Sequence, residues 1–258
     1  MILGTGTGID QSRAPAGYRA VVTKTTPREH LVSTFVRQNR PVTSMALFDL
    51  DNTLMDRQAA FHGWARHFVD DRGLGDPGFE AVCEWDEDGH ATRQRLFDAV
   101  RDQFGLPDST EELIADYRSS YPAFFLPDPA VNQALSALRT SGWRIGVATN
   151  GPPSQLEKLD RTGILPLLDG FCISDDFGWA KPDRRIFDEA VRRCSGSDGP
   201  PMTVWMVGDT PVPDIMGGAG AGLRTIWLHR GRQWEESGYR PDWVAGSIEE
   251  AVEYMLSR

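Results

Sequence analysis

The apolar run from Met45 to Phe48 leads directly into Asp49-Leu-Asp51, and this stretch constrains the fold more than any other. The run is short, contains an aromatic residue and lacks glycine and proline, so it predicts a buried strand. Two carboxylates buried at its end need compensation, which a divalent metal would provide. Because residues two apart face the same side of a strand, we expect both acids to serve one pocket at the strand's carboxyl end.

The composition limits the classes of function. The 258 residues are 40% hydrophobic and 25% charged, which suits a folded protein with a sizeable apolar core. The net charge of −10 disfavours nucleic acid or an anionic membrane as the main partner. The sequence contains neither an apolar run long enough for a membrane span nor an apolar signal core, so we expect a cytoplasmic protein. Its three cysteines lack metal-ligand spacing, which predicts free thiols.

The chain divides into three predicted parts. Residues 1–43 carry six basic and two acidic side chains, which predicts a basic, partly ordered arm, with a helical turn at the apolar residues of 31–36. Residues 57–126 show helical periodicity only, and this segment is too long for an ordinary crossover between two strands. We therefore predict a helical cap domain at 57–126, inserted into a core domain made of residues 44–56 and 127–258.

Strand and helix patterns alternate regularly after residue 128. Apolar runs predict four further strands, at 143–149, 170–174, 203–207 and 224–228. Repeated strand–helix units form parallel sheets with right-handed crossovers and helices on both faces. The predicted fold class is therefore α/β, a Rossmann-like doubly wound parallel sheet with an inserted all-helical cap domain.

Four of the predicted strands lead into loops whose polar side chains suit phosphoryl transfer. Because the carboxyl ends of parallel strands share one edge of a sheet, we expect these side chains to lie together. The chemistry requires a nucleophile, an acid for the leaving oxygen, donors for the phosphoryl oxygens and a cation. The residues that offer these parts are Asp49, Asp51, Thr149, Asn150, Lys181, Asp209 and Asp214.

Four motifs in chain order contain these residues: Asp49-Leu-Asp51-Asn-Thr53, Thr149-Asn-Gly151, Lys181-Pro-Asp183 and Gly208-Asp209-Thr-Pro-Val-Pro-Asp214. In this order, each behind an apolar run, they are a specific signal. From Met45 to its C-terminus the chain resembles the haloacid dehalogenase (HAD) superfamily. Within it, the chain is similar to the capped Mg²⁺-dependent phosphatases, such as the phosphoglycolate and N-acylneuraminate phosphatases.

The resemblance implies that the protein hydrolyses a small phosphorylated metabolite in two steps. Asp49 would attack phosphorus and form an aspartyl-phosphate, while Asp51 protonates the leaving oxygen. Asp51 would then take a proton from the water that hydrolyses this intermediate. The motifs leave open whether the protein is a monomer or a homodimer.

The resemblance also implies Mg²⁺ as the cofactor, because oxygen ligands favour this ion. The implied metal-binding residues are Asp49, Asp51 through its backbone carbonyl, Asp209 and Asp214. Asp214 either joins the metal ligands or orients Lys181, and capping the following helix is an equally good role for it. The implied phosphoryl-binding groups are Thr149, the backbone around Asn150, and Lys181, which also neutralises charge on Asp49.

Three alternative functions use the same residues. Dehalogenases of this superfamily expel halide, need no proton donor and lack an acid at the position of Asp51, so Asp51 favours a phosphohydrolase. A phosphotransferase or mutase of the same fold shares all four motifs and stays open. A non-catalytic binding module with this fold is disfavoured because the set of reactive residues is complete.

The cap is expected to select the substrate by closing over the phosphate site. Trp64 and Trp85 offer stacking faces, although helical spacing favours a core position for Trp64. The acidic turn at 85–90 is a candidate specificity loop, but we favour a solvated turn. Trp179, close to Lys181 in sequence, is expected at the pocket mouth. The polar cap candidates are Arg66, His67, His90, Arg93 and Arg95.

Overall fold

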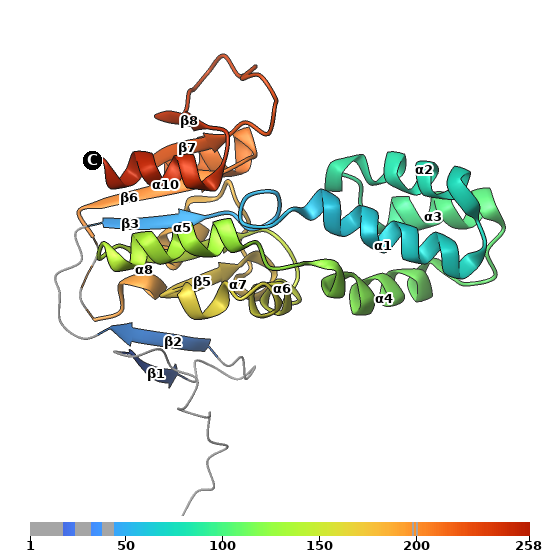
Figure 1. Ribbon diagram of the computed structural model, residues 1–258, viewed down its shortest axis with the longest axis horizontal. Coiled ribbons are helices and arrows are strands. Elements are labelled where there is room, and N and C mark those ends of the chain that lie inside the picture. Colours follow the sequence, from blue (N-terminus) through green and yellow to red (C-terminus); the bar gives the residue numbers. More distant parts are fainter. Residues whose placement is uncertain (1–17, 24–31, 38–43, 198, 200) are drawn as a thin grey trace, which may run out of the picture.

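A six-stranded parallel sheet forms the core of the α/β part of the protein (Figure 1). The computed structural model describes residues 18–23, 32–37, 44–197, 199 and 201–258. All neighbouring strands of the sheet are parallel. In spatial order the strands are β5 (Gly170–Ile173), β4 (Arg144–Thr149), β3 (Ser44–Phe48), β6 (Thr203–Gly208), β7 (Arg224–Leu228) and β8 (Trp243–Ala245).

The two faces of β3 belong to two different apolar clusters. Ala46 and Phe48 lie in the larger cluster with α5 (Pro129–Thr140) and α10 (Ile248–Leu256), whereas Met45 and Leu47 lie in a second cluster with α8 (Arg184–Ser195). Burial on both faces explains why the strand is continuously apolar rather than alternating. Helices therefore cover both sides of the sheet, and the predicted α/β, doubly wound fold class is confirmed.

Shorter elements also connect the strands of the sheet. They are α6 (Gln155–Arg161), η4 (Leu165–Leu167), α7 (Ser174–Phe177), η5 (Pro211–Met216) and α9 (Gly217–Gly220). In η5 the chain forms a π-helix directly after β6. The five predicted strands are confirmed, whereas β8 was not predicted because it has three residues, two of them exposed.

The chain between β3 and α5 forms a helical body at one end of the molecule (Figure 1). Trp64 is 1% exposed there and packs against Phe68, Phe97 and Tyr117, so it belongs to the core. None of the helices in the described part of the chain is long and apolar enough to span a membrane. The elements of the helical body are α1 (Arg57–Arg72), α2 (Gly75–Asp86), η2 (Glu87–Gly89), α3 (Arg93–Phe104), α4 (Thr110–Ser120) and η3 (Tyr121–Phe124).

Two strands of the N-terminal arm lie within the described residues. β1 (Tyr18–Thr23) pairs antiparallel with β2 (Val32–Arg37) in a separate two-stranded sheet. The predicted helical turn is therefore wrong over 32–36. Pairing with β1 satisfies the backbone there, and the β-branched Val-Ser-Thr-Phe-Val sequence suits a strand. The other residues of the predicted basic arm lie outside the described ranges.

Gly146 provides a test of how closely β4 packs. A Cβ at this position would lie 2.7 Å from Cδ2 of Leu47 and would also overlap Sγ of Cys194. We expect Gly146→Ala to lower the free energy of unfolding by about 1–3 kcal/mol, because the Leu47 and Cys194 side chains that the new Cβ would meet are themselves buried and would have to move. Urea denaturation measures this change.

Gly220→Ala is the matched control, since a Cβ there meets nothing within 4 Å. This substitution should leave stability unchanged or raise it by up to about 1 kcal/mol, because alanine is the better helix former. Equal stability of both variants would contradict the close packing inferred at Gly146.

Candidate active site

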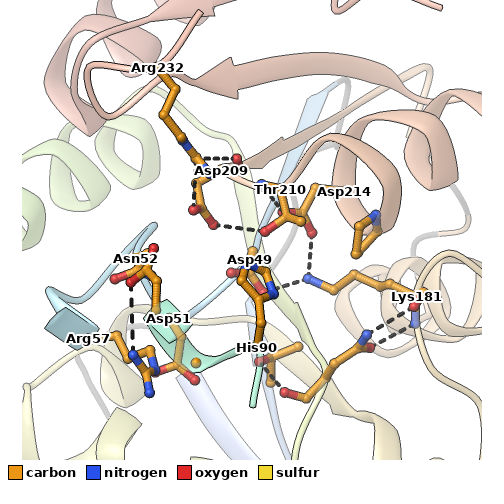
Figure 2. Close-up of a pocket in the computed structure, with 15 residues that line it drawn as sticks. Asp49, Asp51, Asn52, Arg57, His90, Lys181, Asp209, Thr210, Asp214 and Arg232 are labelled. Atoms are coloured by element: carbon orange, nitrogen blue, oxygen red, sulfur yellow. Dashed lines mark hydrogen bonds and ion pairs between the residues drawn. The ribbon is translucent and has the colours of Figure 1, made fainter. Parts of the chain in front are cut away.

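Three buried carboxylates meet at the carboxyl ends of β3 and β6 (Figure 2). Asp49 follows β3, Asp209 follows β6 and Asp214 lies in η5. One carboxylate oxygen from each lies within 4.8 Å of the others. Carboxylates this close repel one another and favour a cation between them, and an all-oxygen donor set suits a hard divalent ion. The three residues therefore fit Mg²⁺.

Lys181 lies between two of these carboxylates (Figure 2). Its Nζ donates to Oδ1 of Asp49 and, at 2.6 Å, to Oδ1 of Asp214. Burial alone would lower the pKa of Lys181, but the two carboxylates outweigh it and raise that pKa well above its usual range. Lys181 is therefore a permanent positive charge beside Asp49.

The three carboxylates are less acidic than ordinary aspartates. Burial raises the pKa of Asp49 to about 7, and the charge of Asp214 adds to the effect, although Lys181 opposes it. Burial is also the main cause of the raised pKa values of Asp209 and Asp214. The environment thus disfavours three negative charges without a further cation.

Asp51 has a different environment from Asp49, although only Leu50 separates them. Nζ of Lys158 donates to both carboxylate oxygens of Asp51, at 2.8 and 2.9 Å, and Nε2 of Gln155 donates to one of them at 2.9 Å. Burial opposes ionisation here, but the charge of Lys158 outweighs it and lowers the pKa of Asp51. The Asp51 carboxylate points to Lys158 and lies outside the three-carboxylate cluster.

The turn after Asp51 depends on a left-handed residue. Asn52 has φ of 62°, and its backbone N–H donates to the carbonyl of Met55 at 2.8 Å. Asparagine tolerates this conformation better than most residues other than glycine. The tight turn allows the chain to pass from β3 into α1 immediately beside the site.

Thr149 and Asn150 end β4 in different roles. The Thr149 side chain is buried, and its Oγ1 accepts a hydrogen bond from Nε2 of Gln155 at 2.9 Å. The Asn150 side chain instead holds the backbone of Lys181, donating to its carbonyl at 2.9 Å and accepting from its N–H at 2.8 Å. Asn150 therefore positions the Lys181 loop.

A cavity of about 210 Å³ collects these groups. Its wall also includes Asp88, Gly89 and His90 from the helical body, so the acidic turn at 85–90 faces the site. The exposed residues of this turn, Glu87, Asp88, Gly89 and His90, agree with the solvated turn that we favoured, and Asp88, Gly89 and His90 also border the cavity. The seven predicted site residues that line the cavity are Asp49, Asp51, Thr149, Asn150, Lys181, Asp209 and Asp214.

Several residues at the site escaped the sequence analysis. Gln155 and Lys158 lie one turn apart on the buried face of α6, and the sequence offered only their spacing because it does not show their burial. Arg230 and Arg232 donate to Oδ2 of Asp209 at 3.2 and 3.0 Å. They come from an irregular segment after β7, where no sequence pattern marks them.

Other predicted candidates lie away from this cavity. Arg66 pairs with Asp76, and Arg95 pairs with Glu87 while remaining largely exposed. Trp179 is 43% exposed and stacks against the Arg185 guanidinium rather than lining the described pocket mouth. The remaining candidates outside this lining are Trp64, His67, Trp85 and Arg93.

Comparison with known proteins agrees with this geometry. The family model of the haloacid dehalogenase-like hydrolases matches residues 44–222, and the chain belongs to this family. The superfamily predicted from the four motifs is thereby confirmed.

Individual relatives are similar over parts of the chain. Pyrimidine 5'-nucleotidase YjjG of Escherichia coli K12 is 38% identical over 133 residues, 51% of this chain and 57%, less than two thirds, of that protein. Phosphoserine phosphatase of Thermus thermophilus is 32% identical over 192 residues, 72% of this chain and 70% of that protein. The crystal structure of a HAD phosphatase from Thermococcus onnurineus superposes with a TM-score of 0.58 at 24% identity, covering 83% of this chain and 98% of that one.

Substitution of Asp49 tests the electrostatics of the metal-free site. The folded protein holds the Asp49 proton up to about pH 7, whereas the unfolded chain releases it near the ordinary pKa of 3.8. Between these values the folded state binds more protons, so the contribution of Asp49 to stability falls as the pH rises and is lost above about pH 7. In EDTA we therefore expect Asp49→Asn to stabilise the protein more at pH 8 than at pH 5.

Thermal unfolding at the two pH values measures this difference. Asp102→Asn, at a largely exposed position on α3, is the control and should show no such dependence. The same shift for Asp49→Asn at both pH values would be evidence against a raised pKa.

Proposed function

We propose that the protein is a Mg²⁺-dependent phosphohydrolase that cleaves a small phosphomonoester through an aspartyl-phosphate on Asp49. The observation that carries this proposal is the position of Asp49, which contacts Lys181 and lines the same cavity as Asp51 and the three-carboxylate cluster. The family and the names of the relatives, phosphatases and a nucleotidase, support the same choice.

The helical body is proposed to be the cap domain, residues 57–126, over a core domain of residues 44–56 and 127–258. Two observations support these boundaries: α1 begins at Arg57, and η3 ends at Phe124 shortly before α5. Gly89 and His90 of this body line the cavity beside the core residues. The cap thus contributes part of the wall that excludes water from the reacting group.

The first chemical step follows from the placement of the side chains. Asp49 attacks phosphorus through a carboxylate oxygen, while Lys181 and the Thr149 hydroxyl offset and bind charge on the phosphoryl oxygens. Asp51 donates a proton to the leaving oxygen. When held by Asp49, Asp209, Asp214 and the backbone carbonyl of Asp51, Mg²⁺ supplies positive charge against the phosphoryl group.

The second step uses Asp51 as a base. Its lowered pKa, the result of the Lys158 contact that outweighs burial, keeps it ionised and able to take a proton from the attacking water. To act as an acid in the first step, Asp51 must gain a proton, so its contact with Lys158 has to loosen when the substrate enters. Nε2 of Gln155 donates to both Asp51 and Thr149 and so fixes the proposed acid relative to the hydroxyl that binds the phosphoryl group.

Phosphate release and metal dependence test the proposed reaction. We expect Mg²⁺-dependent release of phosphate from a panel of small phosphomonoesters, loss of that release in EDTA, and a loss of at least about 1,000-fold in kcat for Asp49→Asn. Unchanged turnover of Asp49→Asn would exclude it as nucleophile. Transfer of phosphate to a second hydroxyl without release would identify a phosphotransferase instead.

Replacement of Asp51 tests its role as acid. Asp51→Asn should lower kcat for alkyl phosphates by about 100- to 10,000-fold. The loss should be much smaller for formation of the intermediate from p-nitrophenyl phosphate, because nitrophenolate leaves without a proton. Burst and steady-state kinetics separate the two steps, and equal losses in the nitrophenolate burst and in alkyl ester cleavage would argue against Asp51 as the acid.

A further inference from the structure

A second cavity, of about 280 Å³, adjoins the first at the junction of the helical body and the core. The two cavities share Asp51, Arg57, Gly89 and Asn150. Asp51 is the proposed acid for the leaving oxygen, so a leaving group bonded to that oxygen extends into the second cavity.

Two arginines of the helical body form one wall of this cavity. Arg57 begins α1 and Arg93 begins α3, and their Nη2 atoms both donate to Oδ1 of Asp86, at 2.6 and 2.8 Å. Asp86 is 2% exposed and Arg57 is 8% exposed. Within this group of three side chains, the two guanidinium groups exceed the one buried carboxylate by one positive charge.

The hydrogen-bonding capacity of these arginines is not used up. Among the described residues, Nη1 of Arg57 and Nη1 of Arg93 have no hydrogen-bond acceptor. The Asp88 carboxylate is 3.9 Å from Nη1 of Arg57, and it also pairs with Arg230 at 3.1 Å. A buried charged donor without an acceptor is unfavourable, and an oxyanion supplied by a ligand would satisfy it.

The other charged residues of the wall balance one another, so the excess positive charge of the two arginines remains, and two aromatic rings form an apolar side. Lys158 is compensated by Asp51, while exposed Arg118 adds a positive charge and Asp175 a negative one. The stacked rings of Tyr117 and Tyr121, 4.6 Å apart, form an apolar side.

We propose that the second cavity binds an oxyanion, a carboxylate or a second phosphate, on the leaving group of the phosphomonoester, with Arg57 and Arg93 as the specificity-determining residues. The inference rests on the proposed hydrolase function for the direction of the leaving group. Gly89 belongs to the same site, because a Cβ there would lie 2.7 Å from Cζ of Arg57. Only glycine allows the turn to pack against this guanidinium, and its φ of 90° requires glycine as well.

Phosphomonoesters of two-carbon compounds that differ in their second functional group test whether the second cavity selects for charge. Phosphoglycolate carries a carboxylate, 2-hydroxyethyl phosphate a hydroxyl and ethanolamine phosphate an ammonium group, while 1,2-ethanediol bisphosphate tests phosphate as the oxyanion. Binding is measured by calorimetry with Mg²⁺ on the Asp49→Asn protein, and kcat/KM is measured on the wild type. We expect at least one of the two anionic esters to bind about 10- to 100-fold more tightly than the hydroxyl ester.

Arg93→Gln should abolish this preference, so that the anionic esters lose about 10- to 100-fold in affinity relative to 2-hydroxyethyl phosphate. Arg93→Lys, which keeps the charge, should retain part of the preference for anionic esters. It replaces the glutamine variant in the test if that variant does not fold. Arg101→Gln, at a partly exposed position on the same helix and paired with Asp102, is the matched control and should change neither affinity.

The outcomes separate this inference from the proposed function. Hydrolysis of all esters with equal kcat/KM, or tighter binding of a nucleoside monophosphate than of both anionic esters, overturns the oxyanion site and leaves the hydrolase in place. An Arg93-dependent preference in binding without hydrolysis of any ester supports the site and overturns the hydrolase. If none of the esters binds, both fail.

Discussion

The buried contact of Lys181 with Asp49 and Asp214 determines how the loops of the site are arranged. Asp214 accepts from the Thr210 N–H at 2.9 Å through its other oxygen, which fixes the start of η5. Asn150 bonds the Lys181 backbone, so the loop after β4 is tied to the same group. Lys181 thus joins the loops that follow three strands to the segment before α8, those after β3 and β6 through its ammonium group and that after β4 through its backbone. Without that charge, two buried carboxylates would face each other without compensation.

The two acids of the first motif show how environment assigns different tasks to one residue type. Burial and a second carboxylate raise the pKa of Asp49, while Lys158 overcomes burial and lowers that of Asp51. A carboxylate beside a fixed ammonium and a metal suits a nucleophile, and one with an adjustable partner suits proton transfer. The difference comes from α6 and from the segment before α8, both distant in sequence from β3.

The sequence predicted the sheet and the seven motif residues because that information is local. Each motif follows an apolar run, and the geometry of parallel strands brings the run ends together. The roles of Lys158 and Arg232 depend on tertiary placement, so a lysine on a helix and an arginine in an irregular segment carried no signal. In β2, the apolar spacing of Val32, Phe35 and Val36 fits a helix equally well, and only the partner strand decides.

The turn between α2 and α3 links the electrostatics of the helical body to those of the carboxylate cluster. Left-handed Glu87, Asp88 and Gly89 bring the Asp88 carboxylate to Arg230, whose Nη1 also contacts Asp209 at 3.2 Å. A cation on Asp209 would compete with Arg230 for that carboxylate, and Arg230 would then interact more strongly with Asp88. A cation bound at the carboxylate cluster would therefore also change the contact between the helical body and the core, through Arg230 and Asp88. The position of the two arginines at the second cavity depends on that same junction.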